Sequence, residues 1–304
     1  MNLNVVVVLV FILTIIHIQL VDSMNSTNQG VLKRKRKDTN ETDVFSIILK
    51  ANEELLKSTG SKIIEHGDIL VDNSRNAMIC NNSPRSCLWP RAKDGNVYVP
   101  YKLGREYNAF SRQLIKRSLD EIAILTCVKF YHSHKHEPAF IDVNSERGNS
   151  APGTFLVTMD VSALCTSIPH NDDGCFAVIG YRGRRQKMSL QIPQCLHFGV
   201  IAHEFLHAIG FHHEHCRSDR NKYVKIFMHN VVHELQYNFN ILHTNNLGTE
   251  YDYSSVMHYG RTVFSRNGLP TILPIPDPNV EIGQIRGLST KDVAKINKLY
   301  NCGM

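Results

Sequence analysis

Residues 203–220 decide both the fold and the chemistry of this chain, and they read H-E-F-L-H-A-I-G-F-H-H-E-H-C-R-S-D-R. His203 and His207 stand four residues apart, so on a helix their side chains project from one face, one turn apart. Gly210 can adopt the left-handed conformation that ends a helix and lets the chain turn back. His213 follows three residues later. The spacing therefore predicts that three imidazoles converge at the end of a helix.

Three imidazoles form a set of ligands that is typical of a catalytic zinc site, and a carboxylate lies next to them in the sequence. Three protein ligands leave one position for water, whereas a structural zinc usually has four protein ligands. Glu204 adjoins the first ligand as a candidate general base. A bare H-E-x-x-H is weak in a chain with 16 histidines, but the longer spacing fixes two further positions and argues against chance. We read His203, His207 and His213 as ligands of one Zn²⁺ per chain. The neighbouring histidines outside this spacing are read as structural or surface residues: His197, His212 and His215.

The first 23 residues have the pattern of a secretory signal peptide. An apolar run from Val5 to Ile16 is followed by polar residues and by the small residue Ser23. The run is short for a membrane span, which makes a signal anchor the weaker alternative. No later segment is apolar enough to cross a bilayer. A secreted chain with eight cysteines is expected to form disulfides, although spacing alone does not choose the pairs.

The net charge of +6 lies after residue 75, because the first 75 residues carry equal numbers of acidic and basic side chains. This positive charge is too diffuse to predict a nucleic-acid partner. Residues 24–45 are polar and contain a basic run at 33–37, which suits a protease-sensitive linker. Arg75, in a polar stretch before Asn76, is a candidate cleavage point.

Hydrophobic periodicity predicts helices and strands in alternation, without an internal repeat. Helices are expected at 44–57, 105–125 and 198–209, and a last helix capped by Ser289 is expected to end at Leu299. Strands are expected at 97–101, at 127–130 and in two short runs between Cys175 and Cys195, around an Arg-rich turn at 182–185. One face of the 198–209 helix is expected to be buried: Val200, Ile201, Phe205, Leu206 and Ile209.

Two groups of residues give the chain a resemblance to a known family. Phe211 follows the glycine, Glu214 follows the third histidine, and Arg217-Ser218-Asp219-Arg220 come next. Ser255-Val256-Met257-His258-Tyr259 lies about forty residues further on. Together they resemble the signature and the Met-turn of the astacin family of metzincin zinc endopeptidases. The resemblance extends over most of 76–302 and is nearest to the fish hatching enzymes, or choriolysins, with six cysteines. Its other segments include Leu88-Trp89-Pro90, 94–101, 276–284 and 297–302.

The resemblance implies an α+β fold with two lobes and an active-site cleft between them. The N-terminal lobe, about 76–210, would hold a twisted mixed sheet and two long helices. The C-terminal lobe, about 211–304, would be mostly irregular with a final helix. Residues 1–23 would be the signal peptide and 24–75 the propeptide of the 76–304 catalytic domain. The implied disulfides are Cys80–Cys87, Cys127–Cys302 and Cys175–Cys195.

The resemblance also implies roles for single residues. Glu204 would take a proton from the attacking water and deliver it to the leaving amine. Tyr259 would bind the metal at rest and then swing away to stabilise the oxyanion, and Met257 would form the apolar floor of the site. Asp68, in Gly67-Asp68-Ile69, would block the open zinc position until cleavage between Arg75 and Asn76.

Three features depart from the family pattern. His66 stands where relatives carry an acidic residue before the glycine. The segment of about 144–173 is longer than the connection that relatives have between these strands, and it contains Cys165. Cys216 stands where relatives carry a small polar residue. Either Cys165 and Cys216 form a fourth bridge or both are free, and the long segment is either an insert or a gene-model error.

The expected protein is thus a secreted zinc endopeptidase, made as a zymogen and stored in secretory granules before release. Its substrates would be extracellular proteins, with egg-envelope glycoprotein the leading candidate, and it would act as a monomer without membrane or nucleic acid. Two alternatives remain: the same protease in kidney, immune or brood tissue, or a catalytically silent zinc-binding protein.

Overall fold

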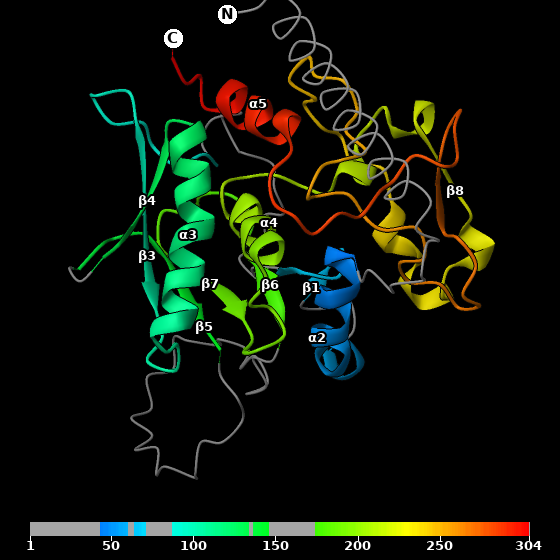
Figure 1. Ribbon diagram of the computed structural model, residues 1–304, viewed down its shortest axis with the longest axis horizontal. Helices are drawn as coiled ribbons and strands as arrows, with labels where there is room; N and C mark the ends of the chain where they lie inside the picture. The colour runs from blue at the N-terminus through cyan, green and yellow to red at the C-terminus, as the bar shows by residue number, and fades with distance from the viewer. Residues whose placement is uncertain (1–42, 60–63, 71–86, 134–135, 146–173, 304) are drawn as a thin grey trace, which may run out of the picture. The chain divides into compact units, whose positions relative to one another are not determined.

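A seven-stranded sheet with two helices against it forms the frame that carries the candidate site (Figure 1). The computed structural model describes residues 43–59, 64–70, 87–133, 136–145 and 174–303, all within one compact unit, Thr42–Met304. The strands, in sheet order, are β1 (Ile64–Glu65), β2 (Ile69–Leu70), β6 (Cys175–Ala177), β7 (Arg185–Leu190), β5 (Phe140–Asn144), β3 (Val97–Leu103) and β4 (Val128–His132).

The direction of the strands changes at one side of this sheet. Strands β7, β5, β3 and β4 are mutually parallel, whereas β6 runs antiparallel to β7. Strand β2 adds to the other side of β6 in a parallel sense, and β1 pairs antiparallel with β2. The sequence predicted β3, β4, β6 and β7; it missed β5 and the two-residue strands β1 and β2, which are too short to show alternation.

Two helices cover the sheet and pack against each other (Figure 1). Helix α3 (Ala109–Leu125) begins four residues later than the expected 105–125, because the Asn108 side chain accepts a hydrogen bond from the Ser111 N–H and caps it there. Helix α4 (Phe198–Ala208) matches the expected helix at 198–209. The five side chains predicted to be buried are buried, and burial extends beyond that face to every residue from Gly199 to Ala208.

Helix α4 ends where the sequence predicted. Ile209 is its last capping residue, and Gly210 follows with φ +105°, a conformation that suits glycine because it has no Cβ. The Phe211 N–H then donates to the Leu206 carbonyl at 3.0 Å, which turns the chain back along the helix. This turn delivers His213 to the end of α4.

The described residues after Gly210 are largely irregular. They contain four 3-10 helices, Glu214–Cys216, Arg220–Lys222, Met228–Asn230 and His233–Phe239, and a two-stranded antiparallel sheet of β8 (Val224–Ile226) and β9 (Ile272–Pro274). Helix α5 (Thr290–Leu299) starts at Ser289, as predicted, with a capping box between Ser289 and Asp292. No helix among the described residues is long and apolar enough to cross a membrane.

The expected helix at 44–57 is also present. Helix α2 (Val44–Thr59) packs against α4 and β6, and its buried side chains include Val44, Phe45, Ile48 and Leu55. This helix, which precedes His203 by more than a hundred positions, is therefore part of the hydrophobic core.

Two disulfides have the pairing that the resemblance implies. Cys127 is bonded to Cys302, which joins the start of β4 to the residues after α5, and Cys175 is bonded to Cys195. Cys87 is disulfide-bonded, but its expected partner Cys80 lies outside the described residues. Outside them too lie Arg75, Asn76, Cys165 and most of the long 144–173 segment.

The two disulfides close loops of very different length, 175 and 20 residues. Loop-closure entropy predicts that Cys127→Ser/Cys302→Ser lowers the free energy of unfolding by about 5 kcal/mol, and Cys175→Ser/Cys195→Ser by about 3 kcal/mol. Denaturant unfolding of both double variants measures the difference. A larger loss from the short loop would show that native-state packing, and not chain entropy, sets the contribution of these bonds.

Candidate metal centre

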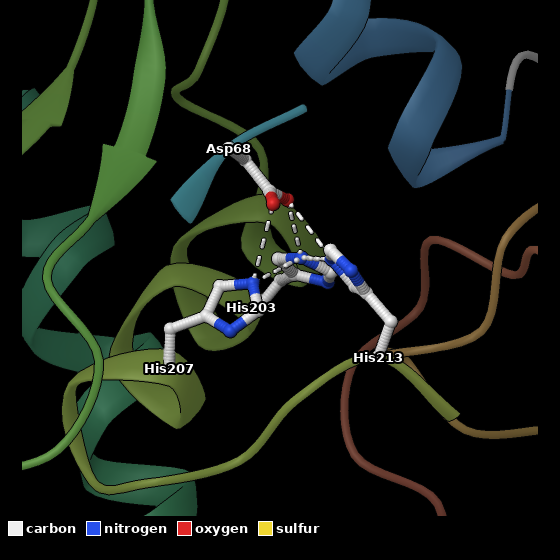
Figure 2. Close-up of side chains that lie close together, drawn as sticks. All are labelled: Asp68, His203, His207 and His213. Atoms are coloured by element: carbon white, nitrogen blue, oxygen red, sulfur yellow. Dashed lines mark hydrogen bonds and ion pairs between the residues drawn. The ribbon is translucent and has the colours of Figure 1, made fainter. Parts of the chain in front are cut away.

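Three imidazole rings converge on one point at the end of α4. The Nε2 atom of His203 lies 3.1 Å from that of His207 and 3.2 Å from that of His213, and all three side chains are buried. Figure 2 shows the rings turned toward one another and toward the carboxylate of Asp68. One oxygen or nitrogen atom from each of these four residues lies within 4.8 Å of all the others.

The hydrogen bonds of the other ring nitrogens make this a cation site. The Nδ1 of His203 lies 2.9 Å from the Val256 carbonyl oxygen, and the Nδ1 of His207 lies 2.7 Å from that of Phe211. A carbonyl oxygen only accepts, so each Nδ1 carries the hydrogen and each Nε2 of the neutral ring presents a lone pair.

Lone pairs that face each other at 3.1 Å repel unless a cation lies between them. Burial lowers the pKa of His207 and of His213, which favours the neutral form that binds metal. Three buried imidazoles with converging Nε2 atoms, two of them fixed in the tautomer that presents a lone pair, therefore fit a zinc ion and would hold it.

Asp68 supplies the fourth donor from the turn between β1 and β2. Its Oδ2 lies 2.9 Å from His203 Nε2 and 3.2 Å from His213 Nε2, and its Oδ1 lies 3.5 Å from His207 Nε2. Burial opposes ionisation of Asp68, but the surrounding imidazoles of His213, His207 and His203 outweigh burial. They hold the pKa of Asp68 well below its usual range.

The turn that presents Asp68 depends on a glycine. Gly67 has φ +84°, and a Cβ at this position would lie 2.8 Å from the Phe45 ring. The Ala177 N–H donates to the Asp68 carbonyl at 3.0 Å, and Ile69 pairs with Ala177. The segment 64–70 is thus held along β6 as an added strand, with the Asp68 carboxylate directed at the histidines.

Glu204 lies beside the first ligand on α4 and is fully buried. Neither of its carboxylate oxygens has a hydrogen-bond partner among the described residues. Burial, and then the charge of Asp68, raise the pKa of Glu204 well above its usual range. An unpaired buried carboxyl group next to a metal ligand is costly for stability, which is typical of a group kept for chemistry.

Tyr259 and Met257 are also buried near the histidines. The Tyr259 ring centroid lies 4.7 Å from that of His213, and its hydroxyl donates to the His66 carbonyl oxygen at 2.5 Å. The Met257 carbonyl oxygen accepts the Glu214 N–H at 2.9 Å, which ties the turn at 255–257 to the segment that carries His213. The phenol is therefore occupied by the same 64–70 segment that supplies Asp68.

Sequence reasoning missed two residues of α2 that reach this site. The Phe45 ring lies 3.8 Å from Tyr259 and 5.1 Å from His213, measured between ring centroids. Asn52 donates through Nδ2 to the Gly67 and Cys175 carbonyls, both at 2.7 Å, and its Oδ1 accepts the Cys175 N–H at 2.6 Å. An apolar and an amide residue in an amphipathic helix carry no signal of their own, so only the docked geometry identifies them.

Cys216, which the sequence left open, is a free thiol with no disulfide to any described cysteine. It is fully buried, with its Sγ 3.4 Å from His215 Nε2 and 3.6 Å from His66 Nδ1. Burial raises the pKa of the Cys216 thiol strongly. The thiol thus packs as a small neutral side chain against His66, the residue that departs from the family pattern.

Comparison with known proteins agrees with this arrangement. Residues 161–301 match the peptidase family described as Astacin. Low choriolytic enzyme of Oryzias latipes is 36% identical over 281 residues, which cover 92% of this chain and 92% of that protein. High choriolytic enzyme 1 of the same fish is 38% identical over 261 residues, covering 86% of this chain and 84% of that protein. The chain belongs to the astacin family.

The solved structure of high choriolytic enzyme 1, described as a hatching enzyme zinc-protease, has a TM-score of 0.62 with this astacin at 39% identity. The match covers 75% of this chain and 100% of the chain in that structure. The expected α+β astacin fold is confirmed. As an astacin, the chain is a zinc metalloendopeptidase with one catalytic zinc.

The Asn52 contacts predict how firmly the 64–70 segment of this astacin is held. Asn52→Ala leaves the Cys175 N–H and two carbonyls without their buried partner, at roughly 1–3 kcal/mol for each group. We expect the amides of 64–70 to exchange with solvent about 10- to 100-fold faster, as measured by hydrogen–deuterium exchange. Glu53→Ala, at an exposed position of the same helix, is the matched control, and equal exchange in both variants would contradict the role of Asn52.

Proposed function

We propose that this astacin is made as a secreted zymogen, in which residues 24–75 are a propeptide that keeps the 76–304 catalytic domain latent. The observation that carries the proposal is Asp68, whose carboxylate lies within 3.5 Å of all three histidine Nε2 atoms. A carboxylate in this place occupies the coordination position that water or substrate would need. The proposed signal peptide is 1–23.

Four further contacts support latency. The Tyr259 hydroxyl is bonded to the propeptide carbonyl of His66, and Phe45 lies against the Tyr259 ring. Asn52 and the added strand β2 occupy the backbone groups of β6, an edge on which an extended peptide could otherwise pair. Cleavage between Arg75 and Asn76 would separate the segment from the catalytic domain and allow it to leave.

The residues of the catalytic domain then have distinct tasks. His203, His207 and His213 hold the zinc, which when bound acts as a Lewis acid on the scissile carbonyl and on water. Glu204 accepts the proton of the attacking water on its carboxylate and delivers it to the leaving amine. Tyr259, freed from His66, donates a hydrogen bond to the oxygen that becomes negative as the carbonyl is attacked. The buried Met257 forms the apolar floor of the site.

We further propose that the substrates are extracellular proteins, with egg-envelope glycoproteins at hatching as the leading class. The support is the similarity to two enzymes of Oryzias latipes that are named choriolytic. The enzyme would act as a secreted monomer, released from secretory granules. The same protease in kidney, immune or brood tissue is the alternative, and localising the transcript to hatching glands separates the two.

The role of Glu204 predicts the effect of one isosteric change. In chain cleaved after Arg75, Glu204→Gln is expected to lower peptidase activity by about 10²- to 10⁴-fold, because the amide cannot accept the proton. Metal analysis should still find one zinc per chain, since the three histidines are unchanged. Glu234→Gln makes the same change at an exposed position and should keep full activity. Activity retained in Glu204→Gln would exclude Glu204 as the base.

The role of Asp68 predicts premature activity. Every protein in this test also carries Arg75→Gln, which prevents cleavage. Asp68→Ala should then hydrolyse a peptide substrate at least about tenfold faster than the parent. Each ~1.4 kcal/mol by which the blocked state is destabilised raises the ratio of open to blocked sites tenfold. Glu65→Ala, at an exposed position of the same segment, is the control. A silent Asp68→Ala zymogen that gains activity after cleavage in an Arg75 background would show that other contacts maintain latency.

A further inference from the structure

Asp292 is a buried carboxylate at the start of α5 that faces the turn at 255–257. Its side chain is 2% exposed. Its Oδ1 accepts the Ser255 hydroxyl at 2.6 Å, and its Oδ2 accepts the Val256 N–H at 3.0 Å. The third bond, from the Ser289 N–H to Oδ2 at 3.0 Å, is the one that belongs to the capping box of α5.

The turn that Asp292 holds is bonded in turn to the zinc site. The Val256 carbonyl oxygen lies 2.9 Å from the Nδ1 of His203, and the Met257 N–H donates to the Ser255 hydroxyl oxygen at 3.1 Å. Asp292 therefore fixes the donors on one side of this turn, while the turn presents an acceptor to His203 on the other. Two hydrogen bonds separate the carboxylate from the ligand.

The acceptor matters because a neutral imidazole carries a single N–H. When Val256 holds that hydrogen on Nδ1, the Nε2 of His203 keeps its lone pair for the metal, and the ring cannot rotate freely. A turn that shifted would leave His203 free to take the other tautomer or to turn its ring away. Zinc affinity should therefore depend on how firmly the turn is held.

An ordinary capping role does not account for this placement. A capping acid at the start of a helix commonly faces solvent and needs one backbone donor, whereas Asp292 is buried and has two donors from a different segment. Burying a carboxylate is costly unless hydrogen bonds satisfy it. The fold thus keeps a buried carboxylate where it holds the turn beneath His203.

We propose that Asp292 is a positioning residue for the zinc ligand His203 and acts through the Ser255–Val256 turn. The proposal rests on the assignment of His203 as a ligand in the proposed function. It gives α5, which lies far from 203–213 in the sequence, an indirect part in metal retention.

The test compares three variants of the full chain, loaded with zinc: Asp292→Ala, Asp292→Asn and Ser289→Ala. Ser289→Ala is the control for the cap of α5: it removes the hydroxyl that accepts the Asp292 N–H and donates to Asp252, and it leaves both bonds from Asp292 to the turn. Zinc release to a chelator, the absorption spectrum of the Co²⁺-substituted protein and the thermal midpoint are measured for each.

We expect Asp292→Ala to release zinc about 10- to 100-fold faster than the parent and to change the Co²⁺ spectrum. Asp292→Asn should be intermediate, because its amide oxygen can still accept the Val256 N–H. Ser289→Ala should lower the thermal midpoint and release zinc at the parent rate. Equal zinc release from Asp292→Ala and Ser289→Ala would overturn the proposal and leave Asp292 as a helix cap.

A fourth variant tests the proposal if Asp292→Ala does not fold. Ser255→Ala removes the hydroxyl that Asp292 and the Met257 N–H share, while the cap of α5 stays intact. Faster zinc release is expected here as well, and release at the parent rate would overturn the proposal. A parent chain that binds zinc but lacks peptidase activity after cleavage would contradict the proposed function, and not this inference.

Discussion

The structure depends on three imidazoles being held with their Nε2 atoms close together. Nε2 atoms that carry lone pairs repel each other at this distance unless a cation lies between them, so the rest of the fold has to impose the arrangement. Helix α4 is buried on all sides, which fixes His203 and His207 one turn apart, and the glycine turn after the helix brings His213 to the same point. The carbonyls of Val256 and Phe211 then fix the tautomers.

The 64–70 segment makes the strand pairing and the hydrogen bond that a peptide substrate could make, but it places the Asp68 carboxylate at the histidines. It pairs with the edge of β6 opposite β7, gives a carbonyl to Tyr259 and directs Asp68 at the histidines. The left-handed Gly67 makes the sharp turn that this requires. His66 packs its ring on Cys216, so two of the three departures noted in the sequence lie in contact.

How much of this follows from sequence depends on the range of the interactions. The helix of 198–209, its end at Gly210 and the Ser289 cap were predicted, because local spacing and capping chemistry determine them. The α2 contacts of Asn52 and Phe45 were not predicted, since most of them join residues more than a hundred positions apart. The strands β1 and β2 are likewise too short for periodicity to show. For Asp292 the sequence indicated only a residue in a final helix, and its link to His203 appears only when the Met-turn is in place.

The hydrogen-bond partners of the ligand rings indicate which contacts the removal of the proposed propeptide would leave in place. The Nδ1 atoms of His203 and His207 are bonded to Val256 and Phe211, and Asp292 holds the turn at Val256. None of these partners lies in the 43–70 segment. That segment instead contacts the groups a substrate would need: the open side of the histidines, the Tyr259 hydroxyl and the backbone of β6. Removal of the proposed propeptide would therefore free the reactive groups without removing the hydrogen bonds that hold the two ligand rings, so the zinc site can stay assembled while it becomes accessible.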